Sequence, residues 1–255
     1  IMKTKFSLIL ISLLPLFINA QLKAVAYNDG DQKLSGFSVK SKLEIKNKPG
    51  VLILPAWMGI DDHSKESATK LAELGYYTFV ADIYGVGNTP TNSKEAGQKA
   101  GYYKKNISEY QKRIQLALDE LVKQGANPDN IVVIGYCFGG NGAIEAARRN
   151  MKVKGIVSFH GGLGKDVTRP NEPIGPKVLI LHGADDPYVT KEEIESFQNE
   201  MRIVNADWQM VYYANAVHSF TNKSSGNDNS KGAAYNEKAA KRSWQSMLNF
   251  LKETL

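Results

Sequence analysis

The sequence predicts an α/β fold in which helices cover both faces of a mostly parallel sheet. Apolar, strand-like runs alternate with helix-like segments along most of the 255 residues, and such alternation requires parallel strands joined by crossover helices. One run, 131–134, leads directly into a glycine-rich turn and a helix-compatible segment. No repeat or linker divides the chain, so we expect one large domain over residues 21–255.

The individual elements follow from short sequence patterns. Two short strands, 24–27 and 34–39, flank Asn28-Asp29-Gly30 and predict an antiparallel hairpin at one edge of the sheet. A polar, glycine-bearing excursion over 86–103 is expected to cover the upper edge of the sheet. The other predicted elements are strands at 50–55, 76–81, 131–134, 153–159, 177–181 and 208–213, and helices at 63–74, 108–124, 191–204 and 233–255.

The turn after 131–134 matches the nucleophile elbow, a sharp strand-turn-helix connection that lifts a nucleophile above the sheet. Its Gly-x-Cys-x-Gly pattern places Cys137 where serine is commoner. This pattern narrows the prediction to the α/β-hydrolase fold. A thiol at a helix N-terminus is favoured as thiolate by the helix dipole. The alternative is a small buried cysteine in a glycine-rich turn, because free cysteines are usually core residues.

The order of residues along this fold predicts the partners of Cys137. An acid and then a histidine follow the nucleophile on loops after later strands. His218 follows strand 208–213 and is the expected base, whereas His160 and His182 end earlier strands and are expected beside or beneath the pocket. The acid is Asp185 or Asp186 after strand 177–181. Spacing alone does not choose between them, and the other aspartate is expected in a turn or helix cap.

Two backbone amides are expected to stabilise an oxyanion. One belongs to Phe138, directly after the nucleophile, and the other to Trp57, in the loop after strand 50–55. Together with Tyr84 and Tyr136, these two residues are expected to shape an apolar, aromatic substrate pocket, although any of the four could belong to the core.

With these residues identified, the chain resembles the dienelactone hydrolase family over nearly all of 21–255. The resemblance rests on the elbow, on Asp186-Pro187-Tyr188-Val189 and on His218-Ser219-Phe220. It implies that Asp186 is the acid and that Tyr84 lies at the active site. Ala56 stands where members that act on dienelactone carry a glutamate, and Asn222 stands where they carry an arginine. Without the glutamate, Cys137 is expected to pair directly with His218 at rest.

The predicted activity is hydrolysis of a small or medium carboxylic ester or lactone through a Cys137-His218-Asp186 triad and an acyl-thioester intermediate. Two alternatives remain: a non-catalytic binding protein on a hydrolase scaffold, and an acyltransferase that uses the same triad. No cofactor is expected, and no metal site, since the four histidines are too dispersed for close ligand spacing.

The N-terminal segment predicts export to the periplasm or out of the cell. Lys3 and Lys5 precede the apolar run 6–18, and Ala20 stands at the expected cleavage site, so residues 1–20 resemble a signal peptide. The run is short for a membrane span, and no stable membrane insertion is expected after cleavage. The formal net charge of +6 would become +4 without these lysines. The scattered lysines predict no nucleic-acid binding, and we expect a monomer.

Overall fold

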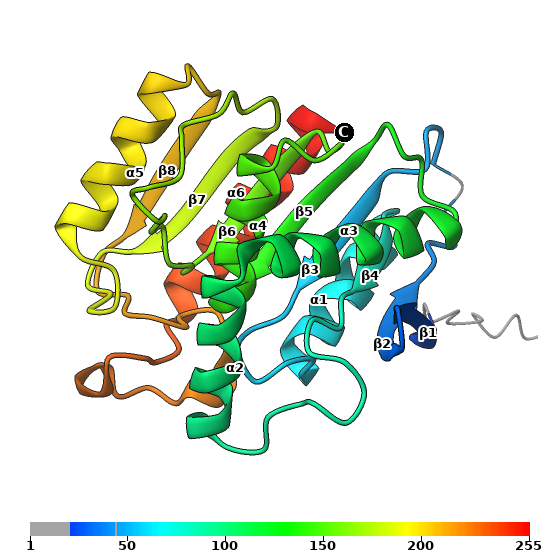
Figure 1. The fold of residues 1–255 in the computed structure, drawn as a ribbon, viewed down its shortest axis with the longest axis horizontal. Coiled ribbons are helices and arrows are strands. Elements are labelled where there is room, and N and C mark those ends of the chain that lie inside the picture. The colour runs from blue at the N-terminus through cyan, green and yellow to red at the C-terminus, as the bar shows by residue number, and fades with distance from the viewer. Residues whose placement is uncertain (1–20, 44) are drawn as a thin grey trace, which may run out of the picture.

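A computed structural model describes residues 21–43 and 45–255, so the predicted signal peptide lies outside the described residues. The chain forms one eight-stranded sheet in the order β1-β2-β4-β3-β5-β6-β7-β8 (Figure 1). The strands are β1 Lys23–Asp29, β2 Gln32–Val39, β3 Gly50–Leu54, β4 Tyr77–Val80, β5 Ile131–Tyr136, β6 Gly155–Phe159, β7 Lys177–Gly183 and β8 Trp208–Tyr213.

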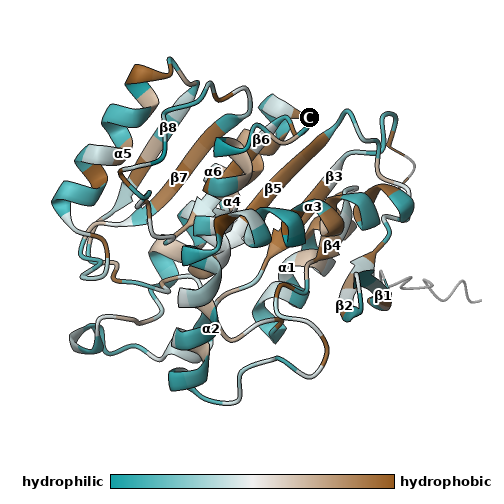
Figure 2. Ribbon diagram, viewed as in Figure 1, coloured by the Kyte–Doolittle hydropathy of each residue, from teal (hydrophilic) through white to brown (hydrophobic). Residues whose placement is uncertain are grey.

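The strand directions confirm the predicted fold class. β1 and β2 form the expected antiparallel hairpin, and β2 joins the sheet antiparallel to β4. All pairings from β4 through β3 to β8 are parallel. Every residue of β3, β5 and β6 is buried, which explains their largely apolar sequences. In Figure 2 the central strands are brown, while the outer faces of the helices are largely teal.

Helices cover both faces of the sheet and create two apolar cores. One core contains α3, α4 and α5, and the other contains α1 and α6, which lie behind the sheet in Figure 1. No helix in the described ranges is both long and apolar enough to span a bilayer. The helices are α1 Asp62–Glu73, α2 Ser93–Lys105, α3 Ile107–Lys123, α4 Phe138–Arg148, α5 Lys191–Ile203 and α6 Glu237–Thr254, with short 3-10 helices η1 Lys223–Ser225 and η2 Asn229–Lys231.

The helix α2 was not predicted. It begins within the polar excursion 86–103 and ends two residues beyond it. Its N-cap is Asn92, whose side chain accepts the Glu95 amide at 3.0 Å. Its buried side chains are only Ala96, Ala100 and Tyr103, a face too small to give a strong apolar period. The helix packs on α3 at the carboxyl end of the sheet (Figure 1), the edge where sites form in this architecture.

A buried ionic network joins α4 to α5. The Arg148 guanidinium donates to Glu145 at 2.9 Å and to Glu200 at 3.1 and 2.7 Å. It also donates to the carbonyl oxygens of Leu163 and Gly164. All three charged side chains are buried, and Glu145 and Glu200 each have one further cationic partner, Arg169 and Lys165, respectively. These ion pairs replace the water that the buried charges have lost. The network fixes the helix that carries the elbow.

Candidate active site

The elbow is a strained turn between β5 and α4. Cys137 has φ 55° and ψ −114°, a conformation that costs a non-glycine residue about 1–3 kcal/mol. Its amide donates to the Phe159 carbonyl at 3.0 Å, and its carbonyl accepts the Asn141 amide at 3.2 Å. A Cβ on Gly135 would overlap the Gly139 carbonyl, and a Cβ on Gly139 would overlap the end of β3. The glycines therefore allow the start of α4 to pack closely against β5 and the end of β3. This packing places the thiol at the carboxyl end of the sheet.

The three predicted triad side chains meet above the strand ends. His218 Nε2 lies 3.0 Å from Cys137 Sγ, and His218 Nδ1 lies 2.8 Å from Asp186 Oδ2. The other carboxylate oxygen, Oδ1, accepts the amide of Tyr188 at 2.9 Å. The Asp186 side chain is fully buried, whereas Asp185 is exposed. The three residues follow β5, β7 and β8, so the parallel sheet brings together positions that are far apart in sequence.

The electrostatics favour a thiolate-imidazolium pair. Burial alone would raise the pKa of Cys137, but the hydrogen bond and charge of His218 outweigh burial, and the pKa is lowered. Burial alone would lower the pKa of His218, but its bonds to Asp186 and Cys137 raise that pKa to about 10. The Phe138 amide and the Lys104 ammonium also lower the thiol pKa. Because each charged form stabilises the other, the two groups titrate as a pair.

The two predicted oxyanion donors lie on either side of the elbow. Phe138 begins α4, and its amide hydrogen-bonds toward the sulfur. Trp57 lies in the loop between β3 and α1, where its carbonyl accepts the Tyr84 hydroxyl at 2.8 Å. The end of β3 packs against Gly139, which brings this loop beside the elbow. The two loops that carry the predicted donors therefore lie next to each other, and the role of these amides remains a prediction.

The predicted aromatic pocket residues are mostly buried. Phe138 stacks between Tyr84 and Tyr110, with ring centroids 5.8 and 4.6 Å apart, and the Tyr110 hydroxyl donates to the Phe138 carbonyl at 2.9 Å. Tyr136 stacks on Phe159 in the opposite core, and its hydroxyl lies 3.0 Å from Ser67. Phe138 and Tyr136 are each 2% exposed. The buried rings of Phe138, Tyr84 and Tyr136 therefore pack around the elbow. Of the four predicted pocket residues, only Trp57 is exposed.

Further residues lie close to the site without a sequence motif to mark their roles. Tyr188 contacts His218 edge to face, with centroids 5.3 Å apart. His160 is buried on another side of that imidazole at 5.3 Å, with Nε2 2.8 Å from Thr221 Oγ1. His182 instead packs against Tyr212. The position of His160 agrees with the expectation for the histidines that end earlier strands.

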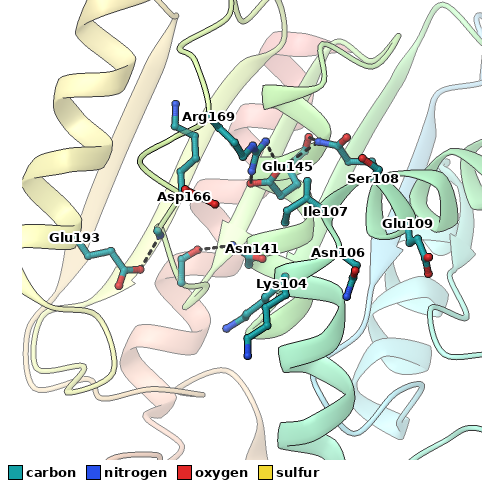
Figure 3. A pocket seen from close by; sticks show the side chains of 15 residues that line it. Lys104, Asn106, Ile107, Ser108, Glu109, Asn141, Glu145, Asp166, Arg169 and Glu193 are labelled. Carbon is teal, nitrogen blue, oxygen red and sulfur yellow. Dashed lines mark hydrogen bonds and ion pairs between the residues drawn. The ribbon is translucent and has the colours of Figure 1, made fainter.

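A polar cavity of about 1060 Å³ adjoins the elbow between α2, α4, α5 and the loop after β6 (Figure 3). Asn141, one turn of α4 beyond Cys137, lines it, and Lys104 extends toward it from α2. The Arg169 guanidinium pairs with the Glu145 carboxylate in its wall. Across residues 21–43 and 45–255, no group of three or more His, Cys, Asp or Glu side chains is arranged to hold a metal ion.

A nucleophile elbow at the end of a buried parallel strand, in a sheet covered by helices on both faces, defines an α/β hydrolase. The model of the dienelactone hydrolase family matches residues 34–255. The chain belongs to the dienelactone hydrolase family and is a hydrolase, as the resemblance in its motifs implied.

Solved structures and curated relatives agree with this assignment. A dienelactone hydrolase-like promiscuous phosphotriesterase from metagenomic libraries is 34% identical, with a TM-score of 0.86 over 92% of this chain and 99% of that one. A putative carboxymethylenebutenolidase of Yersinia pestis is 23% identical over 89% of this chain and 85% of its own length. A probable 2-oxo-3-(5-oxofuran-2-ylidene)propanoate lactonase of Bradyrhizobium is 24% identical over 80% and 83%.

Proposed function

We propose that this hydrolase cleaves small or medium carboxylic esters or lactones with Cys137 as nucleophile, His218 as acid and base, and Asp186 as the residue that orients the imidazole. The observation that carries the proposal is the continuous hydrogen-bonded line from the sulfur to the carboxylate, at 3.0 and 2.8 Å. Relatives named as a butenolidase and a lactonase support this substrate class. Nucleophile, base and orienting acid are the three groups that acyl transfer needs.

In the acylation step, the Cys137 thiolate attacks the carbonyl carbon and forms a C–S bond. The negative charge moves to the carbonyl oxygen, where the amides of Phe138 and Trp57 would stabilise it. When the tetrahedral intermediate collapses, the C–O bond of the ester breaks and the imidazolium of His218 gives its proton to the leaving oxygen. An alcohol departs, or the opened end of a lactone remains attached, and an acyl thioester is left on the enzyme.

In the deacylation step, the now neutral His218 removes a proton from water as the water attacks the thioester. The C–S bond breaks, a carboxylic acid forms, and the thiolate-imidazolium pair returns. Asp186 accepts a hydrogen bond from the Nδ1–H of His218 throughout and does not take its proton, which keeps Nε2 directed at the reacting atoms. No electron transfer or additional reactant is required.

The namesake substrate of the family is not the one we propose. Asn222 stands where family members that act on dienelactone carry an arginine, and its side chain accepts the amide of Ser224 and caps η1. An uncharged cap of this kind offers no cation for a substrate carboxylate. We therefore propose an ester or lactone whose binding does not depend on a carboxylate contact at Asn222.

The direct test is hydrolysis of a chromogenic carboxylic ester by wild type and Cys137→Ala. We expect wild type to hydrolyse the ester and the variant to fall to the background rate, because the variant lacks the sulfur that lies 3.0 Å from His218 Nε2. Full activity in the variant would overturn the thiol mechanism. Addition of competing alcohol and amine acceptors would reveal acyl transfer as an ester or amide product in place of the acid.

We also propose export, on the composition of residues 1–20 alone. The test is the intact mass of the chain recovered from an expressing bacterium, separated into cytoplasm, periplasm and medium. A mature chain that begins at Gln21 in the periplasm or medium is expected. Uncleaved chain confined to the cytoplasm would contradict the proposal.

A further inference from the structure

Tyr188 is an exposed aromatic ring that the fold nevertheless holds in place. The residue is 60% exposed. Its amide donates to Asp186 Oδ1 at 2.9 Å, and its hydroxyl donates to the Lys231 carbonyl at 3.3 Å. A Cβ added to Gly232 would lie 2.9 Å from the hydroxyl oxygen, so the ring tip rests closely on that glycine. A ring fixed at both ends can contact a ligand without first losing much conformational freedom.

The ring also lies against the base. Tyr188 and His218 meet edge to face, with centroids 5.3 Å apart and an interplanar angle of 88°. His218 is itself largely covered, with 15% of its side chain exposed. Tyr188 is thus the exposed aromatic neighbour of the imidazole, while the neighbouring His160 ring is buried.

The proposed chemistry fixes which part of the substrate comes to this place. His218 can protonate a leaving oxygen only within hydrogen-bond reach, so the leaving group must lie on the side of the imidazole. The carbonyl oxygen lies on the other side, toward Phe138 and Trp57. A substituent on the leaving oxygen must pass the imidazole, and the exposed aromatic ring that contacts this imidazole is Tyr188.

We infer that Tyr188 is a specificity-determining residue that binds the leaving group, and that the enzyme prefers esters whose leaving group is aromatic or bulky and apolar. The inference rests on the proposed function. Contact between two aromatic rings, or between a ring and apolar carbons, gives a preference of about tenfold. The acyl group has no part in this contact.

The experiment compares phenyl acetate with ethyl acetate, because both give the same acetyl-enzyme. The intrinsic reactivity of each ester cancels when wild type is divided by variant. We expect Tyr188→Ala to lower kcat/KM for phenyl acetate about tenfold more than for ethyl acetate. The rate at which acetyl-enzyme loses its acetyl group, followed by intact mass after excess ester is removed, should stay unchanged because the leaving group has already departed.

Two further variants complete the experiment. Tyr188→Phe retains the ring and should retain the preference. Tyr212→Ala is a matched control, because Tyr212 is 46% exposed and contacts His182 edge to face at 5.5 Å in place of His218. Both esters should react with this variant as with wild type.

The outcomes distinguish specificity from orientation of the base. If Tyr188→Ala slows both esters equally and also slows deacylation, the ring only positions His218 and the inference is overturned. If wild type turns over phenyl acetate and the variant loses no preference, the inference fails while the proposed function stands. If wild type forms no acetyl-enzyme from either ester, the proposed function fails first.

Discussion

Replacement of Asp186 by asparagine tests how much the buried carboxylate contributes to the reactive pair. The carboxylate has two acceptor oxygens, and each already has a donor: His218 Nδ1 at 2.8 Å and the Tyr188 amide at 2.9 Å. An asparagine of the same shape offers one acceptor and one NH₂ group. Whichever way the amide is turned, one of the two N–H donors faces another donor.

The expected loss in kcat/KM follows from the hydrogen bond that these two opposed donors cannot make. Asp186→Asn removes a negative charge and one hydrogen bond to a charged group, and such a bond contributes about 2 kcal/mol. This corresponds to about a 30-fold loss in kcat/KM. The pKa of His218 should fall from about 10, and the pKa of Cys137 should rise, since the imidazolium that stabilises the thiolate is less favoured.

The assay combines turnover of a chromogenic ester with the ultraviolet absorbance of the thiolate across pH. Asp185→Asn is the matched control, because Asp185 is the adjacent, exposed aspartate and should leave both readouts unchanged. The reasoning is refuted if Asp186→Asn retains the activity and thiolate titration of wild type, or if Asp185→Asn gives the larger loss.

Three more outcomes follow from the geometry. With increasing pH, kcat/KM should first rise as the Cys137 thiolate forms, at a pH below the ordinary pKa of a thiol. It should then fall near pH 10, as the imidazolium of His218 loses its proton. A single rise centred on an ordinary thiol pKa would contradict the ion pair. Gly139→Ala should destabilise the fold by about 2 kcal/mol or more in denaturant unfolding, because its Cβ would overlap backbone, and a neutral effect would show that the elbow can relax. Arg148→Met should cost about 3 kcal/mol in the same assay, because the buried carboxylates of Glu145 and Glu200 lose the cation that they share and keep only Arg169 and Lys165, respectively. Wild-type stability would mean that Arg169 and Lys165 are sufficient to compensate both carboxylates.

Much of the fold could be predicted because its signals are local. The buried strands read as continuous apolar runs, and the strand at 208–213 has the bounds of β8. The hairpin is also as predicted, although its turn residues are Gly30 and Asp31, one position later than the Asn28-Asp29-Gly30 signal suggests. The helix α2 could not be predicted in this way, since its buried face consists of two alanines and one tyrosine.

Chain order predicted which loops meet at the site, but it did not predict how the aromatic side chains pack there. A parallel sheet brings the loops after its strands to one edge, so chain order was sufficient to group Cys137 and His218 with Asp185 or Asp186 as a hypothesis. The choice of Asp186 came from the resemblance to the dienelactone hydrolase family. The orientation of an aromatic ring has no such rule. Phe138 and Tyr136 leave the elbow in opposite directions and enter different cores. Tyr188 contacts the histidine across 30 residues of sequence, and only the folded loops reveal the contact.

The intact mass of the protein after brief exposure to activated acyl esters tests the central claim most directly. Wild type should gain the mass of one acyl group and lose it again as the carboxylic acid is released. Cys137→Ser should gain no acyl group that turns over at a comparable rate, because the serine hydroxyl lacks the low pKa of the thiol. A wild-type enzyme that releases acid without any transient adduct on Cys137 would contradict the account.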